Sequence, residues 1–396
     1  MSTSTQMEVV IVEAIDPALP RMGGGEVYSH NLLEYLLKMN VPTTLIGVSS
    51  SNGHSTQGGF FFVPVAKNAS LGNLSYVLRL VASGSFSLVR PGAIVHVQRP
   101  EYALPFALLC RNNPKLVTLH GRILHGVRLK QPRVVARIYR MVESFCLRHS
   151  AAIIAVDDGT KEFYEEEYPW LRGKIRVIPI GIDLTRFKVL DRDHVRAKWG
   201  FKRTEKVVMY VGRLEIEKDL GFLIESFRLV LPQVPNARLV LVGDGRDRRR
   251  LEEMAQGLSL EELLFMGAQK PDCMPEILNC ADVLTLCSLY EGSPTTVKEA
   301  LACGVPVVST RVGDVCGIVR GNVNGRVVPK DAQQFSQAIV DILSTEDREI
   351  ARRQCVNSAS EFGFDQIGAR TVRLYRELLV QDGCGSDVYK ERLPKC

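Results

Sequence analysis

Two glutamates eight positions apart, Glu291 and Glu299, are the most specific indication of a ligand-binding site in this 396-residue sequence. The residues between them begin with Gly292-Ser293-Pro294-Thr295-Thr296, which predicts a loop that turns into a helix, with Ser293 as N-cap and Pro294 at the first helical position. A helix start presents unpaired N–H groups and the positive end of the helix dipole, so it binds anions. Two carboxylates beside an anion site would suit a ligand with both phosphates and hydroxyls, such as a sugar nucleotide.

A pair of cations follows an apolar segment earlier in the same half of the chain. Val207–Val211 predicts a buried strand, and it runs directly into Gly212 and Arg213, with Lys218 five residues further on. Arginine offers a planar fork of donors and lysine a compact point charge. The spacing therefore predicts that both cations bind one diphosphate.

Glycines follow the next predicted strand, Ala237–Val242. Gly243 and Gly245 flank Asp244 there. A glycine has no side chain to keep a ligand away from the backbone, so this loop is predicted to lie close to the ligand.

Two histidines lie at strand ends in the first half of the chain. His120 follows the predicted strand Leu116–Leu119, and His96 lies near the end of Ala93–Val97. Ligands of open α/β sheets bind beyond the carboxyl ends of the strands, so His120 is well placed for a role at the ligand. A lone histidine is more often structural, and the pattern alone leaves both interpretations open.

The 23-residue context 288–310 resembles the Glu-x7-Glu signature of the retaining, nucleotide-sugar-dependent glycosyltransferases of family four, because Glu-Gly-Ser-Pro is followed by Lys-Glu-Ala-Leu-Ala-Cys-Gly-Val-Pro-Val-Val. The resemblance implies an α/β protein of the GT-B fold, in which two Rossmann-like domains, each a doubly wound parallel sheet, face a cleft. It also implies that Glu299 holds the ribose hydroxyls, that Glu291 contacts hydroxyls of the donor sugar, and that Arg213 and Lys218 bind the diphosphate.

Other segments match the family more loosely. Met22-Gly23-Gly24-Gly25-Glu26 resembles its loop after the first strand, which faces the cleft. A dinucleotide fold is the competing interpretation, but the next predicted strand, Thr43–Val48, has no acidic residue after it to hold a ribose. The family places nucleobase contacts near Phe265–Ala268, a segment that includes Gly267, and a histidine near the reacting sugar, which would be His120.

The domain boundaries also follow from the resemblance. Ile178–Phe187 is similar to the family's Pro-x-Gly-x-Asp-x-x-x-Phe linker, and strands alternate with helices on both sides of it. We therefore predict an acceptor-binding domain at 1–184, a nucleotide-sugar-binding domain at 185–364, a helix at 365–380 that crosses back to the first domain, and a polar tail at 381–396.

Positive charge is concentrated in one segment. The net charge is +6, and residues 122–148 hold seven basic residues and one acidic residue. On a helix over 132–149, the arginines share one sector and the apolar residues lie on the other side, these being Arg133, Arg137, Arg140 and Arg148 against Val134, Val135, Ile138, Val142 and Phe145. An ordinary surface helix explains the pattern, and so does docking to anionic lipid. Nucleic acid is disfavoured, because no binding motif accompanies the charge.

Composition indicates a globular protein, with 45% apolar and 24% charged residues. No apolar run reaches the ~18 residues of a spanning helix and no signal peptide is recognisable, so we expect a cytoplasmic protein, at the inner face of the membrane if the basic helix docks there. Ten cysteines without a CxxC pair predict free thiols, and no metal site is expected.

These features predict a retaining glycosyltransferase that moves a hexose or N-acetylhexosamine from a UDP- or GDP-sugar to an acceptor hydroxyl, without a further cofactor. The acceptor is left open between a glycan, a lipid-linked molecule and a small molecule. Glu291 could serve as a nucleophile, as in retaining glycosidases, whereas the family pattern favours a same-face displacement. The alternatives are a GT-B sugar-nucleotide epimerase and a catalytically silent partner of another glycosyltransferase.

Overall fold

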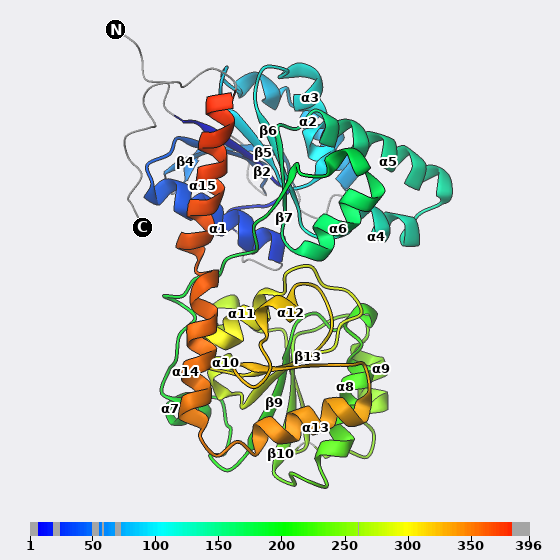
Figure 1. Cartoon of the computed structure of the whole chain (residues 1–396), viewed down its shortest axis with the longest axis vertical. Helices are drawn as coiled ribbons and strands as arrows, with labels where there is room; N and C mark the ends of the chain where they lie inside the picture. The colour runs from blue at the N-terminus through cyan, green and yellow to red at the C-terminus, as the bar shows by residue number, and fades with distance from the viewer. Residues whose placement is uncertain are drawn as a thin grey trace. The chain divides into compact units, whose positions relative to one another are not determined.

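The computed structural model describes residues 7–18, 24–49, 55–57, 59–67, 73–259 and 261–381. Its contacts divide the chain into two compact units, one that runs to Gly181 and resumes at Phe364, and one that spans Ile182–Gly363 (Figure 1). Gly23 and the predicted polar tail beyond Gln381 lie outside the described residues.

The first unit is built on a sheet with the strand order β3-β4-β2-β1-β5-β6-β7-β8, in which only the β3–β4 pair is antiparallel. Its strands are β1 (Val9–Val12), β2 (Thr43–Val48), β3 (Ser55–Gln57), β4 (Phe60–Ala66), β5 (Ile94–Val97), β6 (Lys115–Leu119), β7 (Ala152–Ala155) and β8 (Ile175–Val177). The central strands are buried runs of Val, Ile and Leu, as expected where helices cover both faces of a parallel sheet.

The helices of this unit are α1 (Gly24–Lys38), α2 (Asn73–Ala82), α3 (Leu104–Leu109), α4 (Ile123–Lys130), α5 (Arg133–Arg148), α6 (Asp158–Glu167) and α15 (Phe364–Gln381). Successive strand residues alternate between two apolar clusters, so Val10 packs with α2, α3, α5 and α6, and Ile11 packs with α1 and α15. Figure 1 shows α15, in red, beside α1.

Helix α1 begins earlier than the sequence suggested. Gly24 and Gly25, predicted as part of a loop, are its first two residues. Glycine lowers helix propensity, which is why the sequence indicated a loop at these residues.

The second unit is built on a fully parallel sheet with the order β11-β10-β9-β12-β13-β14. Its strands are β9 (Lys206–Val211), β10 (Ala237–Val242), β11 (Leu263–Gly267), β12 (Val283–Leu286), β13 (Val307–Thr310) and β14 (Gly325–Val328). Strand β9 has β10 on one side and β12 on the other. The loops that leave neighbouring strands diverge at such a reversal, and ligands bind there, beyond the carboxyl ends.

Helices cover both faces of this second sheet as well. They are α7 (Arg192–Lys198), α8 (Leu220–Val230), α9 (Arg248–Met254), α10 (Met274–Cys280), α11 (Thr295–Ala302), α12 (Val315–Ile318), α13 (Ala332–Leu343) and α14 (Arg348–Ala359). Apolar residues of α8 and α13 share one cluster with the sheet, and those of α10, α11 and α14 share the other. The result is three layers, and their packing fixes the loops at both ends of the strands.

Candidate functional site

The loops after β9, β10 and β11 are joined by backbone hydrogen bonds at the carboxyl edge of the second sheet. The Gly212 N–H donates to the Val242 carbonyl at 3.0 Å, and the Gly243 N–H donates to the Gly267 carbonyl at 2.9 Å. Three loops that are separate in the sequence are therefore joined to one another at this end of the strands.

The glycines of the β10 loop are required by this packing. A Cβ atom on Gly243 would lie 1.9 Å from the Gly212 carbonyl oxygen, and one on Gly245 would lie 2.2 Å from the Leu214 carbonyl oxygen. The structure thus explains why these positions are glycine: the β9 and β10 loops approach each other too closely for a side chain. The sequence alone did not predict this contact. Contact of Gly243, Asp244 and Gly245 with a ligand stays a prediction.

Lys218 and Glu291 meet although they are far apart in the sequence. The Lys218 ammonium lies 2.6 Å from Glu291 Oε1, and the Ser288 hydroxyl donates to the same oxygen at 2.6 Å. Both charged side chains are largely buried, with 15% and 16% of their surface exposed. The predicted phosphate-binding cation and the predicted sugar-binding carboxylate are therefore held together by contacts within the protein.

Arg213 lies in the loop between β9 and Lys218 and is exposed. Its carbonyl accepts a hydrogen bond from the Tyr210 hydroxyl at 3.0 Å, which fixes the backbone of the loop. Among the described residues its guanidinium has no ion-pair partner, so its donors are available to an anion.

The start of α11 differs from the prediction. The helix begins at Thr295 with Pro294 as N-cap, one residue later than expected, and Ser293 is not the cap. The Ser293 hydroxyl instead donates to Asp314 Oδ2 at 2.6 Å and accepts from the Lys298 ammonium at 2.5 Å. Since this hydroxyl is engaged in a buried polar cluster, it does not bond to the helix N–H groups.

The buried pair Lys298 and Asp314 was not predicted. Lys298 is fully buried and lies 3.6 Å from Asp314 Oδ2, while the Asp314 N–H donates to the Gly292 carbonyl at 3.0 Å. The cluster fixes the loop that follows Glu291. The available signal was a lysine one turn into a helix whose other residues are mostly small and apolar.

Glu299 lies on the second turn of α11 and is 9% exposed. Burial raises the pKa of its carboxyl group to about 7, against an opposing influence of the nearby Arg186 and Lys298 charges. A carboxyl group with this pKa is partly protonated near neutral pH, and a ligand that donates hydroxyl hydrogens would favour its charged form.

The raised pKa of Glu299 predicts a pH dependence of stability. Between the ordinary pKa of 4.5 and about 7, the unfolded chain releases this proton while the folded chain retains it, so the residue lowers stability as pH rises through that window. Replacing Glu299 by glutamine should remove this loss. The stability of Glu299→Gln relative to the parent protein should therefore increase between pH 4 and pH 8 in urea titrations. The exposed Glu225→Gln serves as control, and an equal response of both variants would contradict the assignment.

In the first unit, His120 lies beside the start of α1. Its Nε2 lies 2.9 Å from Gln98 Oε1, and a Cβ atom on Gly25 would lie 3.8 Å from the His120 ring. Burial, and then the Arg99 charge, lowers the pKa of His120 to about 3, so the ring is neutral. With Nε2 donating to Gln98, the buried Nδ1 has no partner among the described residues and can accept a hydrogen bond.

His96 has a structural role. Its Nδ1 lies 2.6 Å from the Tyr375 hydroxyl of α15, and its Nε2 lies 2.7 Å from the Thr118 hydroxyl. The ring is fully buried, and burial lowers its pKa to about 3. Because both nitrogens are occupied by the fold, His96 connects the sheet to α15 and has no donor or acceptor left for a ligand.

Within the parts of the chain that the structure describes, no group of three or more His, Cys, Asp or Glu side chains could hold a metal ion. The eight cysteines of those parts have free thiols. None of the described helices combines the length and the apolar character needed to cross a membrane.

Two α/β units with parallel sheets define the GT-B class of folds, and solved structures of this class are similar along nearly the whole chain. Sucrose-phosphate synthase from Thermosynechococcus elongatus has a TM-score of 0.79 at 22% identity, covering 95% of this chain and 100% of that one. Anabaena HepE in complex with UDP-glucose has a TM-score of 0.72 at 19% identity, covering 94% and 100%. At these identities the likeness shows the fold alone.

The chain belongs to the group 1 glycosyltransferases. Residues 191–362 match the family described as "Glycosyl transferases group 1", and residues 22–186 match "Glycosyltransferase Family 4". An Escherichia coli UDP-Gal:alpha-D-GlcNAc-diphosphoundecaprenol alpha-1,3-galactosyltransferase is 29% identical over 61% of this chain and 62% of its own length. An uncharacterized glycosyltransferase of Methanocaldococcus jannaschii is 29% identical over 57% and 60%. The chain thus spans about three fifths of the length of these relatives.

Proposed function

We propose that this protein is a retaining glycosyltransferase that moves a hexose or N-acetylhexosamine from a nucleoside-diphosphate sugar to an acceptor hydroxyl. The observation that carries the proposal is the Lys218–Glu291 pair, 2.6 Å apart, with the exposed Arg213 in the same loop as Lys218, at the carboxyl ends of the strands of the second sheet. The name of the E. coli relative, which specifies UDP-galactose, supports a UDP-sugar among the donors.

The chemistry requires charge to be neutralised as the diphosphate leaves. In this proposal Arg213, Lys218 and the first N–H groups of α11 at Thr295 and Thr296 bind the diphosphate, because fixed donors stabilise developing charge without reorganisation. Glu299 accepts hydrogen bonds from the ribose hydroxyls.

Glu291 is proposed to bind the donor sugar rather than to attack it. Its Oε1 already accepts hydrogen bonds from the Lys218 ammonium and the Ser288 hydroxyl. Such charge-assisted bonds stabilise the carboxylate and make it a weaker nucleophile. A same-face displacement without a covalent intermediate is consistent with this geometry. Intact-mass measurement during turnover tests it, since accumulation of a glycosylated protein would contradict it.

His120 is proposed to lie near the reacting sugar. Its unpartnered Nδ1 supplies an acceptor for a sugar or acceptor hydroxyl, and Gly25 at the start of α1 leaves space beside the ring. A neutral imidazole suits this role, because a cation there would oppose a developing oxocarbenium ion.

The donor proposal is tested by thermal unfolding with UDP, GDP, ADP and their sugar conjugates. A ligand at 100 times its Kd should add about 2.7 kcal/mol of stability. One base should stabilise selectively, and both Arg213→Ala and Glu299→Ala should abolish the effect. If no nucleotide stabilises the protein, the silent-partner alternative replaces this proposal. If labelled donor is converted to an epimer without an acceptor, the epimerase alternative replaces this proposal.

We also propose that α5 binds the anionic inner face of a membrane. Val134, Ile138 and Met141, successive on one side of α5, are 67%, 58% and 73% exposed. Arg133 and Arg137 are exposed beside them, and neither has an ion-pair partner among the described residues. An exposed apolar stripe beside unpaired arginines is the pattern of helices that lie in a lipid interface.

The acidic residue of this segment does not oppose the interaction. Glu143 is fully buried and accepts hydrogen bonds from the Tyr164 and Tyr168 hydroxyls at 2.9 and 2.8 Å. In Figure 1, α5 extends outward from the first unit beyond α6. The E. coli relative is named for an undecaprenol-linked acceptor, which supports a lipid-linked acceptor here.

Membrane binding is expected to depend on both the exposed apolar residues and the unpaired arginines of α5. The protein should co-sediment with vesicles containing anionic phosphatidylglycerol at low salt and should be released by 0.5 M salt, because screening weakens the arginine contacts. Ile138→Asp and the double variant Arg133→Glu/Arg137→Glu should each abolish co-sedimentation. The matched surface variant Arg249→Glu, on α9, should not. Binding that persists in the α5 variants would contradict the proposal.

A further inference from the structure

A cavity of about 350 Å³ lies at the amino ends of strands of the second sheet. The candidate donor site lies at the other end, beyond the carboxyl ends of the strands. Residues that precede the amino ends of β12 and β13 line it, including Asp282 and Pro306, together with the first turns of α14. The donor loops follow the carboxyl ends of the same parallel strands, so the two sites are separate. We propose that this cavity binds a small phosphorylated anion.

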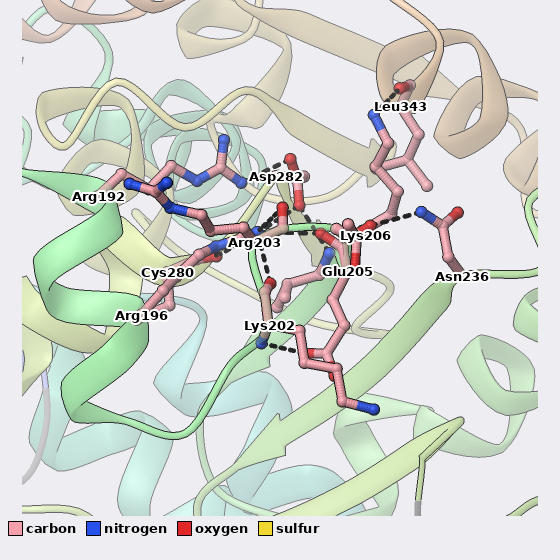
Figure 2. Close-up of polar contacts among 12 residues, drawn as sticks. Arg192, Arg196, Lys202, Arg203, Glu205, Lys206, Asn236, Cys280, Asp282 and Leu343 are labelled. Atoms are coloured by element: carbon pink, nitrogen blue, oxygen red, sulfur yellow. Dashed lines mark hydrogen bonds and ion pairs between the residues drawn. The ribbon is translucent and has the colours of Figure 1, made fainter.

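Positive charge converges on one carboxylate in the wall of this cavity. Arg192 Nη2 and Arg348 Nη1 lie 2.5 and 2.9 Å from Asp282 Oδ1, and Arg196 Nη2 lies 2.7 Å from Oδ2. Figure 2 shows Arg192 and Arg196 reaching Asp282 from α7. Asp282 is 4% exposed at its side chain, and its Oδ2 also accepts from the Val207 N–H. One carboxylate therefore serves three guanidinium groups.

The arginines of this cluster differ in how many of their N–H groups have a hydrogen-bond acceptor or an ion-pair partner within the protein. Arg196 is 3% exposed and donates to carbonyl groups of the surrounding loops, those of Cys280, Lys202, Arg203 and Glu205, so its role is structural. Arg192 lines the cavity, and its buried Nε has no acceptor among the described residues. Arg352, which also lines the cavity, has no ion-pair partner in that part of the chain.

The other charged groups that face the cavity are engaged elsewhere. Arg326 pairs with Asp341 at 3.0 Å, and Asp347 accepts the Ile350 N–H as the N-cap of α14. All three aspartates in the lining are thus committed, while the Arg192 Nε has no acceptor and Arg352 has no ion-pair partner among the described residues. Burial, and then the nearby Arg192 charge, lowers the pKa of Arg348 and of Arg352, as expected where positive charge is in excess.

A phosphate group fits this arrangement. Its several oxygens can accept from more than one guanidinium fork, and arginine is the preferred residue for such recognition. The volume is within the range of about 300–1,000 Å³ that small-molecule sites occupy. Val305, Pro306 and Ile350 supply apolar walls for the remainder of an organic phosphate.

Inorganic pyrophosphate is the probe, titrated calorimetrically into the full chain. Because the candidate donor site would also take pyrophosphate, the titration uses the variant Arg213→Ala/Lys218→Ala, which should still bind. Adding Arg352→Gln should weaken binding by roughly tenfold or more, since a charged hydrogen bond is lost. Adding Arg353→Gln, the exposed neighbour on α14, should leave it unchanged.

Arg192→Lys is the second variant, because it keeps a charge for Asp282 while removing the Nε donor. It should also weaken binding, whether or not Arg352→Gln folds. The inference is overturned if the Arg213→Ala/Lys218→Ala protein does not bind pyrophosphate, or if Arg352→Gln and Arg192→Lys bind as tightly as Arg353→Gln. If no nucleotide stabilises the protein in thermal unfolding, this result is unaffected, since the two sites share no residue.

Discussion

Replacing Lys218 by alanine is expected to lower kcat/KM for sugar transfer by roughly 10²–10³-fold, the loss typical of one preorganised electrostatic contact to a transition state. The ammonium lies 2.6 Å from Glu291 Oε1, and this ion pair positions it. Its removal takes away a charge from the leaving diphosphate and releases the Glu291 carboxylate. Most of the loss should appear in kcat, because the charge on the diphosphate oxygens grows as the sugar bond breaks.

The control is Lys202→Ala, which removes a lysine that is 66% exposed in the same unit. It should leave both kcat/KM and the unfolding temperature unchanged. A double-mutant cycle with Glu291→Gln sharpens the test, because residues in one ion pair should give non-additive losses. A loss in Lys218→Ala smaller than tenfold would exclude a direct role of this ammonium in the reaction.

The sequence predicted the sheet well where strands are apolar and β-branched. The predicted strands Thr43–Val48, Ala93–Val97 and Leu116–Leu119 are present as β2, β5 and β6. Strand β3 was missed because Ser55–Gln57 is three polar residues at the edge of the sheet that pair only with β4. Local pattern specifies a buried strand, but an edge pairing of this kind depends on tertiary structure.

The candidate site was predictable in its types of residue but not in its contacts. The Lys218–Glu291 pair joins two separate loops, and the burial of Lys298 against Asp314 depends on how the α11 and α12 loops pack. Helical periodicity separated the arginines of α5 from its apolar residues. It could not show that Ile138 is exposed, because periodicity identifies faces and only the packed neighbours decide which face meets solvent.

The arginine cavity shows the same limit at longer range. Arg192 is on α7 and Arg348 is on α14, and only the packed fold brings both to Asp282. Scattered arginines in a sequence are ordinary surface residues by default. Their convergence on one carboxylate is a property of the assembled layers.

Gly243→Ala is expected to abolish nucleotide binding and to destabilise the second unit. The added Cβ would lie 1.9 Å from the Gly212 carbonyl oxygen, and the backbone φ of +136° is strained for any residue with a side chain. Since the contact is with backbone, the loops after β9 and β10 must separate. Overpacking of this kind typically costs roughly 1–3 kcal/mol. The separation would also move Arg213, which follows Gly212 directly, away from its position at the edge of the sheet.

Gly317→Ala is the matched control, because its Cβ would meet no atom within 4 Å on a helix of the same unit. There the substitution should be neutral or should stabilise by up to ~1 kcal/mol, through the lower entropy of the unfolded chain. Urea unfolding with and without the nucleotide identified in the thermal screen measures both effects. A Gly243→Ala protein with the parent's stability and an intact nucleotide response would show that the β9 and β10 loops can separate without loss. The close approach of the two loops would then not be what positions Arg213.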